Sequence, residues 1–91
     1  MHVRQSEPQT MSELVSLFDR FLDGPMAYPL EWDDFISWRN KNSNIEEIRD
    51  RLGKFEALLF SRNINEKAEY RRLVTEERNR AAALVGITAR E

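Results

Sequence analysis

The sequence has no cysteine, one histidine and three glycines, and these shortages exclude several kinds of site. Without cysteine, neither a disulfide framework nor a thiolate metal centre can form, which fits a reducing cytoplasm. The glycines stand apart at positions 24, 53 and 86, so the sequence contains no glycine-rich phosphate-binding loop. The one histidine, His2, has no sequence neighbour that would position it for catalysis. We therefore expect a cytoplasmic protein with no enzymatic activity, no metal and no cofactor.

Long apolar runs are also missing. None approaches the roughly 20 residues that a helix needs to cross a bilayer, and residues 1–10 lack the apolar core of a signal peptide. The 91 residues are 41% hydrophobic and 33% charged, a balance typical of one folded domain. We expect a flexible N-terminal arm over residues 1–10, a helical domain over residues 11–87 and a C-terminal tail over residues 88–91.

Apolar residues repeat at helical spacing in four segments, and no alternating strand pattern competes with them. Capping-box patterns at Thr10–Glu13 and Ser43–Glu46 mark two helix starts, and Gly86 followed by Ile87 is typical of a Schellman-type end. Short connections favour antiparallel neighbours, so the sequence predicts an all-α protein, specifically a compact antiparallel four-helix bundle. The four predicted helices cover approximately residues 11–23, 29–39, 44–60 and 65–85.

Residues 28–38 hold both tryptophans and three acidic residues. At 100° per residue, Trp32, Phe35 and Ile36 share one face of the second predicted helix, which indicates that they belong to the core. Trp38 falls at the boundary of that face, where it either shields the core margin or anchors a partner. Tryptophan beside a polar rim is favoured at protein interfaces. We therefore expect a partner protein to bind an edge formed by Glu31, Asp33, Asp34 and Trp38.

Glu77 is unusual because it falls inside the apolar stripe of the fourth predicted helix, among Tyr70, Val74, Ala81 and Leu84. A buried carboxylate needs a partner or must keep its proton. One interpretation is an internal pair with an arginine or with a tryptophan ring N–H, and this one is favoured. The other is an acid that binds a ligand's cation at an opening between helices.

Charge is divided unequally along the chain. Residues 1–38 carry two basic and seven acidic residues, a net charge of −5, whereas residues 39–91 carry twelve basic and nine acidic residues, a net charge of +3. Such a division more commonly serves charge pairing between helices of one fold. The alternative is that it presents an acidic face to a basic partner.

Arginines on the fourth predicted helix suggest an alternative function as a nucleic-acid-binding regulator. Glutamates alternate with these arginines, however, whereas nucleic-acid-binding modules usually present a basic face without compensation. The alternating charges therefore favour a solvated, salt-bridged helix surface over a nucleic-acid-binding surface. The alternative function would use Arg71, Arg72, Arg78 and Arg80.

Two stretches carry a resemblance to a known family. The run with Leu14-Val15, Phe18 and Phe21-Leu22-Asp23-Gly24, followed by Trp32-Asp33-Asp34-Phe35-Ile36 and Trp38, resembles the opening of small bacterial immunity proteins of the colicin-D-immunity kind. The resemblance implies a small antiparallel helical bundle that inhibits a cognate toxin nuclease. It also implies that an acidic surface, here Glu31, Asp33 and Asp34, would cover the toxin's basic nucleic-acid site. The sequence thus predicts a domain that binds another protein, and the resemblance implies the specific form of an immunity-type toxin inhibitor.

Overall fold

The structure is a computed structural model that describes residues 8–24, 30–37 and 39–90. These residues form helices and no strand, so the predicted all-α class is confirmed. The expected third helix is divided in two, and five helices are therefore found among the described residues in place of the four expected. None of them is long and apolar enough to cross a membrane. The helices are α1 (Met11–Asp23), α2 (Leu30–Ser37), α3 (Ser43–Gly53), α4 (Glu56–Leu59) and α5 (Ile64–Leu84).

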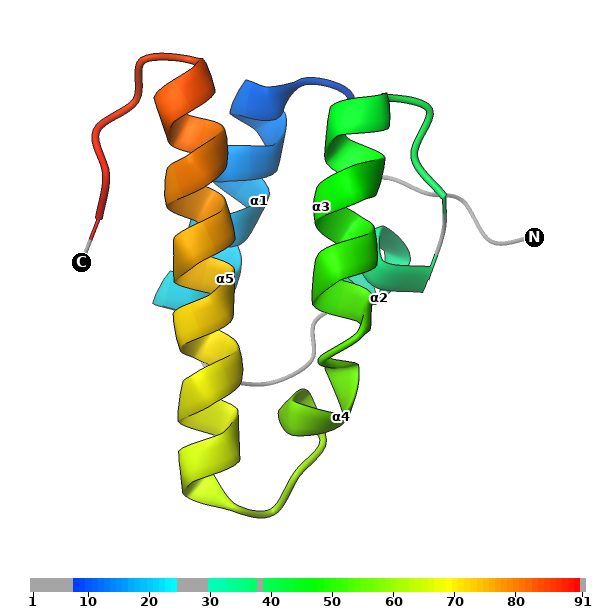
Figure 1. The fold of residues 1–91 in the computed structure, drawn as a ribbon, viewed down its shortest axis with the longest axis vertical. Helices are drawn as coiled ribbons and strands as arrows, with labels where there is room; N and C mark the ends of the chain where they lie inside the picture. The colour runs from blue at the N-terminus through cyan, green and yellow to red at the C-terminus, as the bar shows by residue number, and fades with distance from the viewer. Residues whose placement is uncertain (1–7, 25–29, 38, 91) are drawn as a thin grey trace.

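The long helix α5 is the element on which much of the fold packs. Helix α1 lies beside it and runs in the opposite direction, and α3 runs in the same direction as α1 (Figure 1). Helix α2 packs against α3, and the short α4 packs against α5 near the start of that helix. The apolar stripes of the helices therefore face a shared interior between α1, α2, α3 and α5.

Two helix ends form as the sequence predicts. At the start of α1, the Thr10 Oγ1 accepts a hydrogen bond from the backbone N–H of Glu13 at 3.2 Å. At the end of α5, Gly86 takes a φ of +73°, which glycine adopts readily because it has no Cβ. The Ile87 N–H then donates to the Ala82 carbonyl at 2.9 Å, which is the six-residue hydrogen bond of a Schellman end.

Helix α3 differs from the prediction at both ends. Its cap is Asn42 rather than Ser43, because the Asn42 side chain accepts the amide N–H groups of residues 44 and 45. The helix ends at Gly53 instead of continuing to Phe60. A Cβ placed on Gly53 would have no heavy atom within 4 Å, so close packing does not require this glycine. Its poor helix propensity explains why the chain leaves the helix there.

Part of the expected N-terminal arm is bound to the domain. Pro8 is buried, and its carbonyl accepts a hydrogen bond from Asn40 Nδ2 at 2.7 Å. The Gln9 carbonyl accepts one from Asn42 Nδ2 at 3.3 Å. Residues 8–10 thus belong to the folded unit, and the rest of the arm, residues 1–7, lies outside the described residues.

Trp32 occupies the centre of the core, as predicted for its face of the second helix. Its side chain is fully buried and stacks on Phe21, with ring centroids 4.1 Å apart. It also packs at an angle against Phe18 and Phe35, at 5.5 and 5.4 Å. The ring Nε1 donates to the Tyr70 hydroxyl at 3.1 Å, which ties α2 to α5. Other core residues are Leu14, Val15, Leu17, Leu22, Ile36, Ile45, Ile48, Leu52, Leu59, Val74, Ala81 and Ala82.

Polar contacts at Arg49 and Glu46 join α2 to α3. Arg49 Nη1 donates to the Ile36 carbonyl near the end of α2 at 2.8 Å. Arg49 Nε and Nη2 hold the Glu46 carboxylate at 3.0 and 2.6 Å, and that carboxylate also accepts the Asn40 N–H at 2.7 Å. The hydrogen bonds from Arg49 lower the pKa of Glu46 from its ordinary value of 4.5 to about 2.

Replacing Tyr70 by phenylalanine should lower the unfolding free energy by about 1–3 kcal/mol, because the Trp32 N–H would remain buried without an acceptor. Urea unfolding followed by helical circular dichroism measures this change. The control is Ile64→Ala, at a side chain 79% exposed, which should change stability by less than about 0.5 kcal/mol. Equal stability of Tyr70→Phe and wild type would contradict an energetic role for this hydrogen bond.

Glu46 should make the stability of the fold depend on pH. Because its folded pKa lies below its unfolded value, its contribution is complete above pH 4.5 and is lost as the pH falls towards about 2. A carboxyl titration by nuclear magnetic resonance should therefore place the Glu46 midpoint near pH 2, and Arg49→Ala should return it towards 4.5. A wild-type midpoint near 4.5 would show that the Arg49 contact does not hold the carboxylate.

Candidate functional site

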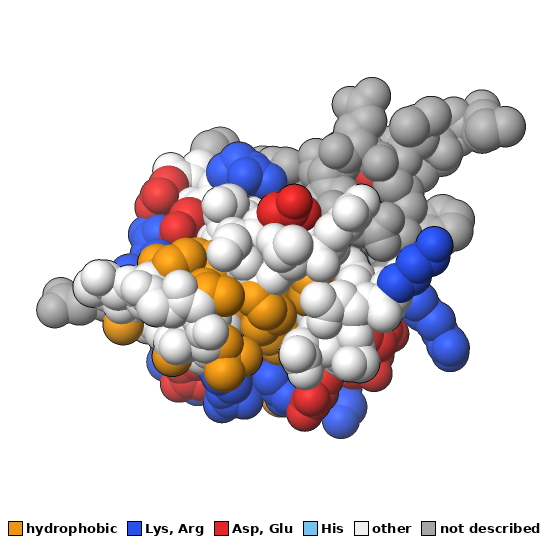
Figure 2. All heavy atoms as spheres, turned by 90° about the horizontal axis from the view of Figure 1, so that it is seen from above, with side chains coloured by type: hydrophobic (Ala, Val, Ile, Leu, Met, Phe, Trp, Pro, Cys, Tyr) orange, Lys and Arg blue, Asp and Glu red, His pale blue; other side chains and the backbone are white. Residues whose placement is uncertain are grey.

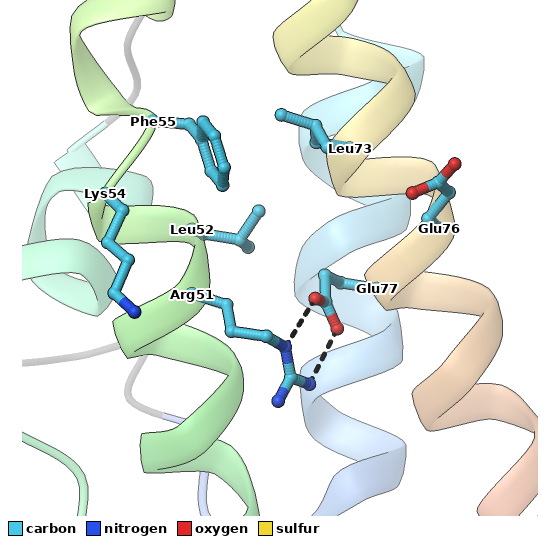
Figure 3. Close-up of a pocket in the computed structure, with 7 residues that line it drawn as sticks. All are labelled: Arg51, Leu52, Lys54, Phe55, Leu73, Glu76 and Glu77. Atoms are coloured by element: carbon cyan, nitrogen blue, oxygen red, sulfur yellow. Dashed lines mark hydrogen bonds and ion pairs between the residues drawn. The ribbon is translucent and has the colours of Figure 1, made fainter.

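A groove of about 280 Å³ lies between α3 and α5. Figure 3 shows Phe55 and Leu73 projecting towards each other from the two sides, with Leu52 between them and charged side chains around them. Leu52 is 1% exposed and forms the floor, whereas Leu73 is half-buried and Phe55 is 43% exposed. The groove therefore offers an accessible apolar surface. Its lining residues are Arg51, Leu52, Lys54, Phe55, Leu73, Glu76 and Glu77.

The break after α3 creates one wall of this groove. Phe55 lies in the turn between Gly53, the last residue of α3, and Glu56, the first residue of α4. Its N–H donates to the Leu52 carbonyl at 3.0 Å, and its carbonyl accepts the Leu58 N–H at 2.9 Å. These two hydrogen bonds fix the turn and hold the ring at the mouth of the groove. A continuous helix to Phe60, as the sequence predicts, would not have this turn.

Glu77 closes one end of the groove as half of an ion pair. Its two carboxylate oxygens accept hydrogen bonds from Arg51 Nε and Nη2 at 2.7 and 2.9 Å (Figure 3). The Glu77 side chain is 10% exposed and that of Arg51 is 32% exposed. The contact with Glu77 raises the pKa of Arg51, which stays charged. Of the alternatives left open by the sequence, the structure has the internal pair with an arginine. The ring N–H of Trp32 is bonded to Tyr70 instead.

The rim of the groove carries opposite charges on its two sides. Lys54 is exposed on the α3 side, and Glu76 is exposed on the α5 side. Glu76 pairs with Arg72 along α5, and Arg51 reaches Glu47 as well as Glu77. The ion pairs formed among the described residues leave Lys54 without a carboxylate. The lysine thus adds an available positive charge beside an apolar surface.

The structure describes two of the four side chains predicted to form an edge for a partner, Asp33 and Asp34. Asp34 is 4% exposed, because α2 is covered on more than one face rather than lying open on one flank. Asp33 is half-buried and accepts a hydrogen bond from the Ser37 hydroxyl at 3.3 Å. Trp38 and the side chain of Glu31 lie outside what the structure describes. Of the expected acidic surface, only Asp33 remains partly accessible among the described side chains.

The four arginines of the alternative function do not share one face. Arg78 is 6% exposed and pairs with Asp19, so it cannot meet a phosphate without breaking that pair. The other three also have partners within the domain. The geometry therefore gives no single basic surface and agrees with the ion-paired helix that the alternating charges favour. The partners are the Leu22 carbonyl at 2.5 Å for Arg71, the Glu69 and Glu76 carboxylates for Arg72, and the Glu77 carboxylate at 3.7 Å for Arg80.

The sequence reading missed a second charged cluster, on the far side of α5 from its contact with α3. Asp19 accepts hydrogen bonds from Arg78 Nε at 2.9 Å and Arg90 Nη1 at 2.8 Å, and Asp23 accepts one from Arg90 Nη2 at 2.6 Å. Partial burial by itself raises the pKa of Asp19, but the bonds from the two arginines lower it overall. The available signal was the i,i+4 spacing of Asp19 and Asp23, since two like charges on one helix face favour a nearby cation.

The end of α5 also differs from the predicted stripe. Tyr70, Val74 and Ala81 are buried as expected, but Leu84 is 67% exposed. The helix extends past the elements that cover its earlier turns, so the apolar periodicity continues where no described neighbour buries it. Helical spacing predicts on which face of the helix a residue lies. It does not predict how far along that helix the packed neighbouring helices extend.

Searches against protein-family models, curated proteins and solved structures find no match for this chain. The resemblance to immunity proteins therefore stays a hypothesis carried by the residues quoted for it. The fold and the groove define a small all-helical domain with an accessible apolar groove that charged side chains flank. In that part of the chain no group of three histidine, cysteine, aspartate or glutamate side chains could hold a metal ion.

Removing Arg51 should destabilise the fold more than removing both members of its pair with Glu77. Arg51→Ala leaves a nearly buried carboxylate without its bidentate partner. We expect a loss of about 1–3 kcal/mol, below the ~3–5 kcal/mol of a fully buried pair, because solvent screens the one-third-exposed arginine. Combining Arg51→Ala with Glu77→Leu should recover most of the loss, since leucine extends the apolar stripe. Urea unfolding measures the stability of each variant. A double variant no more stable than Arg51→Ala would contradict the assignment of Arg51 as the partner that stabilises the Glu77 carboxylate.

Proposed function

We propose that this chain is a non-enzymatic protein-interaction domain that receives a short amphipathic helix of a partner protein in the groove between α3 and α5. The observation that carries the proposal is the position of Phe55, which stays 43% exposed while facing Leu73 across the groove. An aromatic ring left in this position gains stability when a second apolar side chain covers it. Helices that lay an apolar face into such grooves are a recurrent mode of recognition.

Charge supports a particular composition for the partner's helix. Lys54 stands exposed next to Phe55, while the carboxylates of the groove are already paired with Arg51 and Arg72. A partner helix that inserts an apolar side chain between Phe55 and Leu73 could place an acidic residue one turn away, against Lys54. Such rim pairs add little affinity but select the partner and its orientation.

The arrangement of Glu77 favours binding over catalysis. A general acid or base needs access to a substrate. Glu77 is instead held by both carboxylate oxygens in a bidentate contact with Arg51 and is nearly buried. The pair supports the wall of the groove, which is a structural contribution to a binding surface.

An immunity-type inhibitor of a bacterial toxin is the more specific form of this proposal. It rests on the resemblance of residues 14–24 and 32–38 to the opening of that family. In this form the partner would be a nuclease, and the groove would supply its apolar anchor site. The acidic edge implied by the resemblance would then contribute through Asp33 at most among the described side chains, because Asp34 is buried.

Site-specific photo-crosslinking tests the proposal. With p-benzoylphenylalanine in place of Phe55, cells that naturally produce the protein should yield one dominant crosslinked protein after irradiation. The same probe at Ser12, exposed on α1, is the matched control and should give no such product. Leu73→Glu should weaken the complex at least about tenfold, because it places a charge in the apolar contact.

Helical circular dichroism verifies that the Leu73→Glu variant stays folded. A product that forms equally from position 12, or one that survives Leu73→Glu in a folded protein, would place the partner elsewhere and reject the groove as the binding site.

A further inference from the structure

Residues 86–90, here called the strap, turn back from the end of α5 and run alongside that helix (Figure 1). The side chain of Asn79 binds both backbone groups of Arg90: its Nδ2 donates to the carbonyl at 2.6 Å and its Oδ1 accepts the N–H at 2.9 Å. Arg78 Nη1 donates to the Thr88 carbonyl at 2.6 Å. The body of the domain therefore recognises the strap as an extended peptide.

The far end of the strap carries its anchor. The Arg90 guanidinium binds Asp19 at 2.8 Å and Asp23 at 2.6 Å, and its side chain is 27% exposed. Residues 86–89 are exposed, including Ile87 at 36%. The strap is thus attached by hydrogen bonds and ion pairs and contributes no buried apolar side chain. Such an attachment can open without disrupting the core.

Gly86 is the hinge on which the direction of the strap depends. Its φ of +73° turns the chain back along α5, and L-residues with a Cβ rarely adopt this conformation. With Gly86 in an extended conformation, residues 87–90 would leave the end of α5 and continue away from their own domain. Four extended residues reach about 13 Å, the length needed to follow a few turns of a neighbouring helix.

Apolar side chains gather at the same end of the molecule. Leu84 is 67% exposed and Val85 39%, next to Ile87 in the strap. Figure 2 looks onto the upper end of the view in Figure 1, where α5 ends, and shows hydrophobic side chains grouped there with charged ones around them. Exposed apolar groups of this kind mark surfaces that gain stability when covered.

We propose that a second copy of this chain covers this end, and that the two copies exchange their straps to form a two-fold dimer. Each Arg90 would bind Asp19, Asp23 and Asn79 of the other copy. The strap's own sequence already has a complementary site on this domain, at Asp19, Asp23 and Asn79, which favours a second copy over an unrelated partner. Exchange keeps the contacts of Thr88 and Arg90 and gives up the hydrogen bond from Ile87 to the Ala82 carbonyl at the hinge. It adds burial of Leu84 and Val85, and such swapping is a low-cost route to dimers.

Variants of the hinge test the exchange directly by sedimentation velocity of the full chain from about 10 µM to 1 mM. Gly86→Val disfavours the turned-back conformation in each copy, so it should lower the dimer dissociation constant about tenfold or more. Gly86→Asn is the matched control: asparagine tolerates positive φ, so it should dimerise like wild type. Leu84→Glu should weaken the dimer of every variant.

A double variant separates strap exchange from simple stickiness of the apolar end. If the straps are exchanged, adding Arg90→Ala to Gly86→Val should abolish the gain in dimer, because an unanchored strap no longer stores strain in the closed monomer. The exchange is overturned if Gly86→Val does not strengthen the dimer, or if the gain persists without Arg90. Helical circular dichroism must match wild type for each variant, and Gly86→Asn provides the folded reference at the hinge.

Discussion

The fold depends on the burial of one indole ring. Trp32 sits on the short helix α2, which has only eight residues and cannot be stable by itself. Stacking on Phe21 brings this helix to α1, and the hydrogen bond to Tyr70 brings it to α5. A ring N–H inside an apolar core needs an acceptor, so the tyrosine hydroxyl also sets the register in which α5 meets the other helices. Burial in turn raises the pKa of Tyr70 to about 12, which keeps that hydroxyl protonated.

Arginines form a second layer of organisation around this apolar centre. Arg49, Arg51 and Arg78 each extend from one helix to a carbonyl or carboxylate on another element. The unequal division of charge along the sequence serves this purpose in part, since Asp19 and Asp23 of the acidic first segment meet Arg78 and Arg90 of the basic second one. Among the described residues, the groove beside Phe55 and the end of α5 are two places where this network leaves apolar groups uncovered.

The sequence predicted the all-helical class, the helix ends at Thr10 and Gly86, and the core role of Trp32, because these follow from local periodicity and backbone preference. It also placed Glu77 in an apolar stripe and offered an arginine as its partner, but pairing with Arg51 joins positions 26 apart and is decided by tertiary packing. Asp34 was predicted to be exposed and is buried. Helical periodicity assigns one buried and one solvent-exposed face to a helix, whereas α2 has buried side chains on more than one face. The groove could not be foreseen without the break at Gly53, where a weak helix former stopped a segment whose periodicity continued.

The pairing of α1 with α5 has a consequence for how this chain acquires its structure. These helices make the most extensive contact in the fold, yet α1 ends at Asp23 and α5 begins at Ile64, so the whole middle of the sequence must be looped out before they meet. Closing a loop of that length costs entropy that local helix formation does not return. Contacts between segments so far apart in the sequence raise the contact order, and folding should therefore be slower than in bundles of sequential neighbours. Until α5 docks, the aromatic side chains of α1 and α2 can pack only on one another and on α3. Docking of the last long helix is therefore the step that commits the chain to its native state.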